Sequence, residues 1–365
     1  MLSPSPTHPL HPPTPRESPT LDLVLIGTGV VGGRLLELLA RRDGGELPRL
    51  RLAAAANSRH QIVNATGLDP SSVKAALRHG EPLDLARLRA LGAALTNPVL
   101  VDCTSAESVV DAYAAFAEAG FSIATPNKKL ASGPRPRFQK VSAALKRRGL
   151  AFRNETNVGA GLPVLSTLRD LLAGGDRVIR VEGLLSGSLS FLCGLLEDGM
   201  RFSEAVLEAK RLGFTEPDPR DDLSCLDMAR KALILHRELG GTCELEDAEV
   251  EGVLPHDFDT RGRTEVFLAR CKELDAAFSA RLTDLKAKGK TLRVVAEADR
   301  ECARVRVRAL DPDHPLRALR DGENALAFHT EAYRERPLVV RGYGAGAAVT
   351  AIGLLADLLK IGARP

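Results

Sequence analysis

A lysine and a carboxylate in one segment of this chain have the side-chain types and the spacing that proton transfer at a substrate oxygen requires. Asp227 and Lys231 are four residues apart, so on a helix they lie on one face, one turn apart. Such a pair is ordinarily an exposed surface feature. The surrounding apolar residues predict a largely buried helix and so favour a catalytic interpretation. They are Leu223, Leu226, Ala229, Ala232, Leu233 and Leu235.

A second lysine, Lys128, lies in the sequence TPNKK at 125–129, directly after a predicted strand at 121–124. Ligands of open α/β sheets bind at the carboxyl ends of the strands. We therefore expect Lys128 at a bound ligand and Lys129 on the surface. If that ligand is the dinucleotide that a glycine-rich turn at 27–32 predicts, Lys128 lies at its nicotinamide end. An ammonium there can protonate an aldehyde oxygen as a hydride arrives. A neighbouring positive charge lowers the pKa of a lysine, so the same group can act as base in alcohol oxidation.

An acidic segment precedes the helix that carries Asp227. It reads LGFTEPDPRDDL over residues 212–223 and contains two prolines, four acids and one arginine. Acids are favourable at a helix N-terminus for dipole reasons alone. We therefore interpret at least one of Asp221 and Asp222 as a helix cap.

A glycine-rich turn near the start of the chain predicts dinucleotide binding. The sequence GTGVVG at 27–32 follows an apolar strand at 21–26 and opens a predicted helix at 30–41, which is the context that this motif requires. The phosphates would lie on free N–H groups at the positive end of the helix. The alternative is a purely structural turn. The candidate cofactor residues are Gly27, Gly29, Val30, Val31 and Gly32.

The residues after the second predicted strand, at 50–56, bear on the choice of cofactor. An acid at this point binds the ribose 2′-OH of NAD, but the chain has Asn57, Ser58 and Arg59. Arg59 with Ser58 could bind a 2′-phosphate. We therefore expect NADP to be preferred, with NAD as the second candidate. The alternative is that Arg59 is a solvated turn residue.

Alternating strands and helices up to residue 153 predict an α/β fold with a Rossmann-type, doubly wound parallel sheet. The later strands are expected at 99–102, 121–124 and 150–153, with helices at 83–91, 107–119 and 138–148. The remainder predicts a second, α+β domain. Its strands are expected at 176–185 (alternating, with one wet face), 291–298, 302–309 and 337–341, and its helices at 189–197, 203–212, 223–239, 265–286 and 346–361.

The predicted organisation has three parts. Residues 1–20 are rich in Pro and Ser and predict a disordered tail. Residues 21–154 form the dinucleotide-binding domain, completed by the C-terminal helix within 345–365. Residues 155–344 form the catalytic domain. The Gly-rich loop from Glu155 to Leu162 joins the two domains, and its free carbonyls either wrap a hard monovalent cation or serve only as a hinge.

Composition argues against several classes of function. The net charge is only +3 and aromatic residues are 4% with no Trp, which predicts no nucleic-acid partner. No apolar run reaches the ~20 residues of a membrane span, and no secretory signal is visible. The six cysteines form no C-x-x-C pair, which is typical of free thiols in a reducing compartment. We expect a cytoplasmic protein.

Together these motifs resemble homoserine dehydrogenase over nearly the whole chain after the tail. The most specific part is the acidic segment at 212–223 followed by DMARK at 227–231, and the segments at 125–129, 155–162 and 344–351 are also similar. The resemblance implies NAD(P)-dependent interconversion of L-homoserine and L-aspartate 4-semialdehyde, in the aspartate-derived route to threonine and methionine.

The resemblance also implies roles for individual residues. Lys128 and Lys231 would be the catalytic lysines, and Glu216 and Asp227 would bind the substrate. The implied cofactor contacts are Thr104, Ser105, Lys128 and Gly346. A sodium ion would be held by the backbone oxygens of Glu155, Val158, Ala160 and Leu162. A homodimer would form through the middle sheet, at 291–309 and 337–341.

Two departures and two alternatives accompany the resemblance. We expect this chain to lack two domains that family members can carry: the C-terminal ligand-sensing domain of many bacterial members, and a fused aspartate kinase. Without the ligand-sensing domain, we expect little inhibition by threonine. A dehydrogenase of another small amino acid would share the Gly-rich turn without needing the segment from 216 to 231. A non-catalytic dinucleotide-binding sensor should lack proton-transfer residues, whereas this chain offers two lysines.

Overall fold

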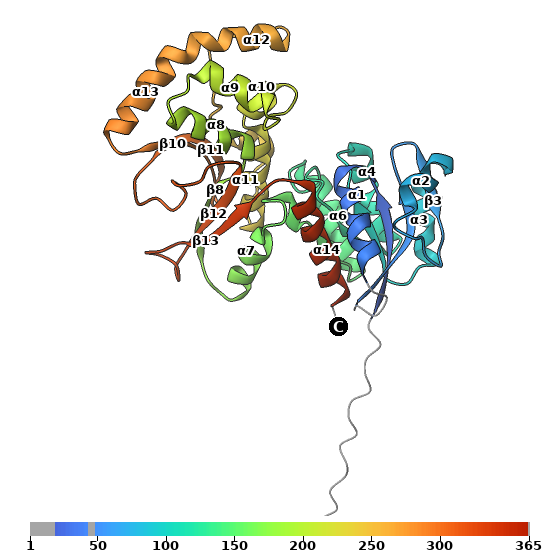
Figure 1. Cartoon of the computed structure of the whole chain (residues 1–365). Helices are drawn as coiled ribbons and strands as arrows, with labels where there is room; N and C mark the ends of the chain where they lie inside the picture. Colours follow the sequence, from blue (N-terminus) through green and yellow to red (C-terminus); the bar gives the residue numbers. More distant parts are fainter. Residues whose placement is uncertain (1–18, 43–47, 364–365) are drawn as a thin grey trace, which may run out of the picture.

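The computed structural model describes residues 19–42 and 48–363, which form two lobes, each built on its own sheet (Figure 1). The predicted tail lies outside the described residues except at its last two positions. Within the described ranges, none of the helices combines the length and apolarity that a membrane crossing requires.

The first sheet has the strand order β4-β3-β2-β1-β5-β6-β7. Its five neighbouring strands β2, β1, β5, β6 and β7 are parallel to one another. This confirms the predicted doubly wound α/β fold. Those strands are β1 (Thr20–Ile26), β2 (Arg49–Ala56), β5 (Pro98–Asp102), β6 (Ser122–Ala124) and β7 (Phe152–Arg153). Two antiparallel strands that the sequence did not predict, β3 (His60–Val63) and β4 (Glu81–Pro82), extend the edge. They arise because the chain turns back after β2 instead of entering a helix.

Helices cover both faces of this sheet. One face packs against α1 (Val30–Arg41), α2 (Val73–Ala76) and the C-terminal α14 (Ala347–Gly362), and Figure 1 shows α14 beside α1. The other face packs against α3 (Leu85–Ala90), α4 (Glu107–Asp111), α5 (Tyr113–Glu118) and α6 (Arg135–Arg147). The short helices η1 (Leu77–His79) and η2 (Leu91–Ala93) link these elements. The last helix of the chain therefore belongs to the lobe that the first strands build.

The second sheet has the order β13-β12-β8-β10-β11-β9. Its strands are β8 (Val178–Leu184), β9 (Glu249–Val250), β10 (Thr291–Ala298), β11 (Ala303–Leu310), β12 (Glu323–Thr330) and β13 (Leu338–Tyr343). The predicted antiparallel pairing of β10 with β11 is confirmed. One face packs against α7 (Val164–Ala173), α8 (Gly187–Glu197), α9 (Phe202–Arg211), α11 (Leu226–Glu238), α12 (Thr264–Arg270) and α13 (Asp275–Ala287). This packing is the largest core of the molecule.

Several element predictions were wrong in detail. The helix expected at 265–286 is α12 and α13, separated by the tighter turn η5 (Cys271–Leu274), because Cys271 and Leu274 turn into the core. The helix expected at 107–119 is divided into α4 and α5. The helix expected at 223–239 is α11, which begins at Leu226, and a separate short helix, α10 (Pro219–Leu223), precedes it. β8 has no continuous wet face, because Glu182 is 1% exposed. β12 was missed altogether.

Candidate active site

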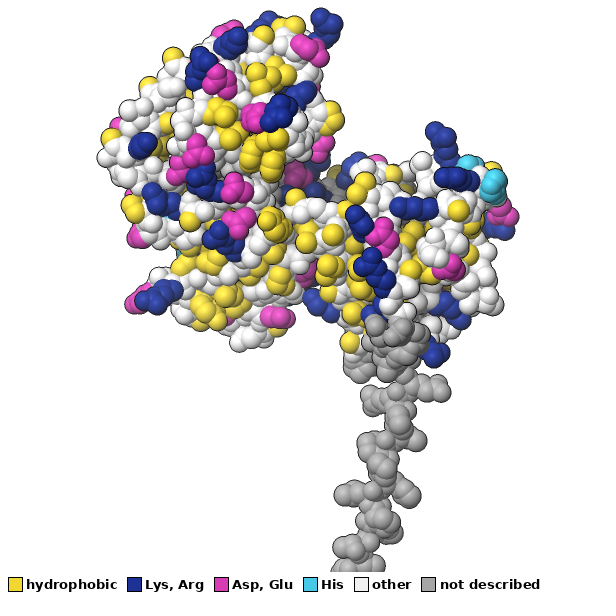
Figure 2. Space-filling model, viewed as in Figure 1, with side chains coloured by type: hydrophobic (Ala, Val, Ile, Leu, Met, Phe, Trp, Pro, Cys, Tyr) yellow, Lys and Arg dark blue, Asp and Glu magenta, His cyan; other side chains and the backbone are white. Residues whose placement is uncertain are grey.

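The sequence-predicted proton-transfer residues meet where the two lobes face each other. Figure 2 shows a hollow between the lobes with acidic and basic side chains in it. On the second lobe, a cavity of about 850 Å³ contains Glu216, Asp227 and Lys231. Further lining comes from residues 185–188, 213–215, 321–322 and 343–346.

Asp227 lies between two lysines from different lobes. Its Oδ2 is 2.8 Å from Lys231 Nζ and its Oδ1 is 3.0 Å from Lys128 Nζ. Lys231 Nζ also donates a hydrogen bond of 2.6 Å to the carbonyl of Leu185. The Lys231 side chain is only 12% exposed, whereas that of Asp227 is 54% exposed. The pair is therefore not a solvated surface pair, since one partner is buried and a third charge joins it across the lobes.

The charges in this group control each other's protonation. Burial lowers the pKa of Lys231 below its ordinary value, and the like charge of Lys128 lowers it further, while Asp227 opposes both effects. Burial raises the pKa of Asp227, but the ammonium groups of Lys231 and Lys128 outweigh it and hold that pKa well below its usual range. Asp227 is thus a fixed negative charge, and Lys231 releases its proton more readily than a solvated lysine does.

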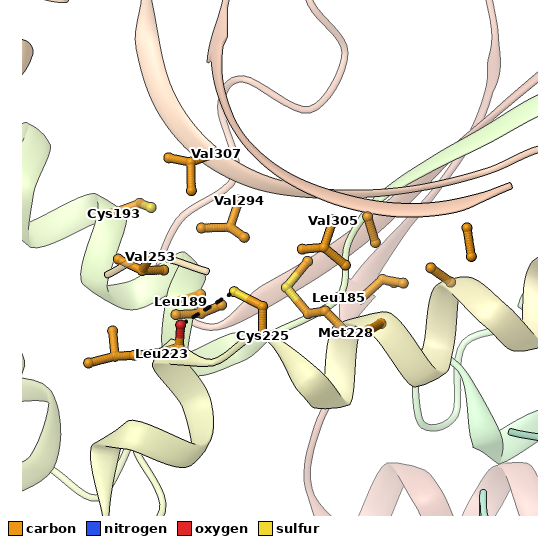
Figure 3. Packing of buried hydrophobic residues seen from close by; sticks show 14 of the residues in the cluster. Leu185, Leu189, Cys193, Leu223, Cys225, Met228, Val253, Val294, Val305 and Val307 are labelled. Carbon is orange, nitrogen blue, oxygen red and sulfur yellow. Dashed lines mark hydrogen bonds between the residues drawn. The ribbon is translucent and has the colours of Figure 1, made fainter. Parts of the chain in front are cut away.

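Helix α11 is held in place by its buried face. Its residue Met228 packs among Leu185, Val294 and Val305 of the core beneath the second sheet (Figure 3). Cys225 precedes the helix with φ of 61°, a left-handed conformation that L residues rarely adopt. This residue is the break between α10 and α11. Leu226, which the sequence placed in the buried set, is 43% exposed, because that break turns it outward.

The acidic segment forms a fastened loop with Glu216 exposed at the cavity. Asp222 accepts hydrogen bonds from the Glu216 N–H at 2.8 Å and from the Ser188 hydroxyl at 2.6 Å. The cap of α10 is Asp218, which accepts from the N–H of Arg220. The expectation that Asp221 or Asp222 caps the helix was therefore wrong, since Asp222 fastens the loop. Neither Ser188 nor Asp218 was singled out from the sequence.

The glycine-rich turn is closely packed on one side and open on the other. Gly27 has φ of 95°, and a Cβ on Gly32 would lie 1.9 Å from the Gly27 carbonyl, so the helix approaches the turn closely only because glycine is present. A Cβ on Gly29 would meet nothing within 4 Å, which leaves space above the turn. Val30, at the start of α1, is 79% exposed.

The turn after β2 divides the predicted cofactor residues into two kinds. The Asn57 side chain accepts hydrogen bonds of 2.8 Å from the N–H groups of Arg59 and His60. It therefore shapes the turn. Ser58 and Arg59 are exposed at the tip, and among the residues that the structure describes the Arg59 side chain has no hydrogen bond or ion pair in place. Ser58 and Arg59 are the groups available to a phosphate.

Sequence reasoning missed a buried carboxylate that joins the cofactor side of the site. Asp102, at the end of β5, accepts hydrogen bonds from the Tyr113 hydroxyl at 2.6 Å, the Thr104 N–H at 2.8 Å and the Asn127 amide at 3.1 Å. Burial raises its pKa, and these hydrogen bonds oppose the rise. Asp102 thus ties the segment of Thr104 to the residue before Lys128. An acid ending an otherwise apolar strand was the available signal.

The Gly-rich loop between the lobes is packed tightly. The Glu155 carboxylate accepts from the N–H groups of Leu165 and Ser166 at 2.7 and 2.9 Å, at the start of α7. Its own N–H donates to Asp357 of α14 at 2.9 Å. The carbonyls of Glu155 and Leu162 accept backbone N–H groups at 3.4 and 2.8 Å. The loop begins with the short helix η3 (Glu155–Asn157).

Comparisons with known proteins find the same family in both halves of the chain. A family model described as "Homoserine dehydrogenase" matches residues 163–359, and one described as "Homoserine dehydrogenase, NAD binding domain" matches residues 27–155. A bifunctional aspartokinase/homoserine dehydrogenase of Haemophilus influenzae is 44% identical over 346 residues, which are 93% of this chain and 42% of that protein. The chain therefore spans about two fifths of the length of this relative.

Further relatives are similar in length or in fold. A homoserine dehydrogenase of Schizosaccharomyces pombe is 40% identical over 271 residues, 72% of each chain. A crystal structure of a Candida auris protein of unknown function superposes with a TM-score of 0.88 at 35% identity, over 95% of this chain and 99% of the other. A hyperthermophilic archaeal homoserine dehydrogenase in complex with NADPH has the same fold, with a TM-score of 0.72 at 23% identity over 93% and 97% of the two chains.

Proposed function

The chain belongs to the homoserine dehydrogenase family, and we propose that it interconverts L-homoserine and L-aspartate 4-semialdehyde with a nicotinamide dinucleotide. In cells this would serve the aspartate-derived route to threonine and methionine. The observation that carries the proposal is the contact of Lys128 and Lys231 with one carboxylate, Asp227, across the two lobes. A binding protein without turnover has no need of this arrangement.

In the oxidation, Lys231 in its neutral form accepts the proton of the homoserine hydroxyl. In the reduction, its ammonium form donates that proton to the aldehyde oxygen. Asp227 keeps Lys231 oriented and favours its charged form, and Lys128 adds positive charge from the first lobe. When bound, the dinucleotide accepts or supplies the hydride.

Glu216 is proposed to bind the substrate ammonium group. It is exposed at the cavity that contains Asp227 and Lys231, and its backbone is fastened by Asp222. A carboxylate at this cavity favours an amino-acid substrate over a simple alcohol. The ammonium group of an amino acid requires a compensating negative charge, which an alcohol does not.

The cofactor is proposed to lie along the Gly-rich turn, Thr104, Ser105 and Gly346, with NADP preferred over NAD. The open space over Gly29 and the close approach of Gly32 to Gly27 support a pyrophosphate at this turn. Exposed Ser58 and Arg59, with no acid in the turn after β2, support a 2′-phosphate.

A further part of the proposal concerns a cation at the loop between the lobes. The backbone oxygens of Glu155, Val158, Ala160 and Leu162 would hold sodium. Each of these carbonyl oxygens has two lone pairs, so the N–H groups that those of Glu155 and Leu162 accept leave one lone pair for a cation.

A homodimer is proposed through the face of the second sheet opposite α11. Arg306, Val339 and Arg341 are 46%, 38% and 48% exposed on that face in the single chain. Analytical ultracentrifugation at the protein concentrations of the activity assay measures the oligomeric state. A monomer at those concentrations would contradict the proposed homodimer.

Incubation of the purified protein with NADP and L-homoserine tests the activity. We expect reduced nicotinamide to accumulate with homoserine and not with serine, which is one methylene shorter. Turnover of serine in preference would indicate a dehydrogenase of another small amino acid. Tight NADP binding without any turnover would indicate a sensor and would contradict the proposal.

A further inference from the structure

We propose that Arg237 is a positioning residue that docks the Lys128 segment onto the helix carrying Asp227 and Lys231. This inference rests on the proposed function and adds a residue to which that function assigned no role. Arg237 lies on α11, six residues beyond Lys231, and its side chain is 9% exposed.

The Arg237 guanidinium links the two lobes with its full set of donors. Its Nη1 donates to the carbonyls of Ala131 and Gly133 in the first lobe, at 2.9 and 2.6 Å. Its Nη2 donates to the Cys243 carbonyl at 3.0 Å and the Glu244 carboxylate at 2.7 Å, and its Nε to the Cys243 carbonyl at 3.3 Å. An arginine has five N–H donors, and each is matched here by one of these bonds.

The carbonyls that Arg237 binds belong to the same turn as Lys128. The Lys128 carbonyl accepts from the N–H and the hydroxyl of Ser132, at 2.8 and 2.9 Å. The N–H of Arg135 donates to Glu244 at 2.9 Å, so the ion partner of Arg237 also holds the far end of the turn. The backbone that carries Lys128 is therefore fixed relative to α11.

Two polar contacts between the turn and α11 bear on the position of Lys128. One is the Lys128–Asp227 contact, and the other is Arg237, ten residues further along the helix, or about 15 Å at 1.5 Å per residue. The first contact involves a half-exposed carboxylate, and such ion pairs are too weak to fix a loop by themselves. Arg237 is buried and multiply bonded, so it is the stronger attachment and sets the position from which Lys128 reaches Asp227.

The burial of this charge is costly, which argues for a specific role. Burial lowers the pKa of Arg237, while Glu244 opposes that effect. The planar fork binds the carbonyls of Ala131 and Gly133 with one nitrogen, and the Cys243 carbonyl and the Glu244 carboxylate with the other. Lysine keeps the charge but cannot reproduce this geometry.

The test is the substitution Arg237→Lys, made in the parent protein and again in a Lys128→Met background. We expect kcat for homoserine oxidation to fall by about 10²-fold in the parent, as misplacement of a catalytic group by about 1 Å can cause. In the Lys128→Met background, Arg237→Lys should change kcat by less than about two-fold, because the group that it positions is gone. An equal fall in both backgrounds, or an unchanged kcat in the parent, overturns the proposal.

Arg293 provides a matched control. It is 1% exposed and donates to the carbonyls of Leu292 and Arg317 and to Glu197, at 2.8, 2.8 and 2.9 Å, away from the Lys128 turn. Arg293→Lys should lower stability without the dependence on Lys128. If Arg237→Lys does not fold, Glu244→Gln decides, with a smaller fall in kcat expected that likewise vanishes in the Lys128→Met background. An inactive parent protein would instead refute the proposed function, so the two failures are distinguishable.

Discussion

Replacing Asp227 by Asn separates the catalytic interpretation of its two lysine contacts from a structural one. The substitution keeps the shape of the side chain and removes the charge that lies 2.8 Å from Lys231 and 3.0 Å from Lys128. The pair with Lys128 is partly exposed on both sides and contributes only about 0–1 kcal/mol to stability, whereas the pair with Lys231 has one buried partner and contributes more. The free energy of unfolding should therefore fall by about 1–3 kcal/mol.

The fall in rate should exceed anything that unfolding could cause, because a protein that is stable by about 5–15 kcal/mol stays almost fully folded after a loss of this size. With Asp227 neutral, Lys231 loses the group that orients it, and kcat should fall by about 10²-fold, the lower end of what acid–base catalysis contributes. Lys231 also loses the charge that opposes burial and Lys128, so its pKa falls further. The base form is then available at lower pH.

The pH profiles give the sign of the effect. In the oxidation, the rise of kcat/KM with pH should move toward acid in Asp227→Asn. In the reduction, the fall at high pH should move in the same direction, because both report the Lys231 proton. Steady-state kinetics in both directions, with urea unfolding as the stability measurement, test this. A kcat within a few-fold of the parent, or unmoved profiles, would refute the reasoning.

Three further predictions concern other parts of the molecule. Arg59→Ala should weaken NADP binding by about 1.5–3 kcal/mol and NAD binding much less, as fluorescence titration would show; equal losses contradict the 2′-phosphate assignment. Burial raises the pKa of Asp357 to about 6, above the unfolded value of about 3.9, so its ionisation removes stability as pH rises from about 4 through 6. Asp357→Asn should therefore be more stable than the parent at pH 7, by up to about 3 kcal/mol, and equal to it at pH 4; a less stable variant at pH 7 is the contrary result. At Cys225, where φ is 61°, Gly should be more stable than Ala by about 1 kcal/mol, and the reverse order in urea unfolding would exclude strain at that residue.

The elements with strong local signals could be predicted from the sequence. The helix at 30–41 was expected with the bounds that α1 has, because the Gly-rich turn marks its start and its leucines repeat at helical spacing. β10 was likewise expected as Thr291–Ala298, from an apolar run bounded by turn residues. The spacing of Asp227 and Lys231 is also local, so their contact follows from the helix alone.

Features that depend on long-range packing could not be predicted. β12 contains Ala325 and Ala327 and is covered on both faces, so it has neither the alternation nor the composition typical of a strand. The arrival of Lys128 at Asp227 depends on how the lobes meet, which no local pattern encodes. The residues near Arg237 in the sequence give no indication of its role. Its partners, the backbone carbonyls of Ala131 and Gly133, lie in a turn more than a hundred residues earlier in the chain.

The central claim is that Lys231 transfers the proton during oxidation of homoserine. The most direct test is kcat of Lys231→Ala with homoserine and NADP, with folding checked by circular dichroism and cofactor binding by fluorescence. The account predicts a fall of roughly 10²- to 10⁴-fold with the fold and NADP binding intact. A folded variant that binds NADP and turns over within a few-fold of the parent would contradict it and would assign the proton to Lys128 or to a water molecule.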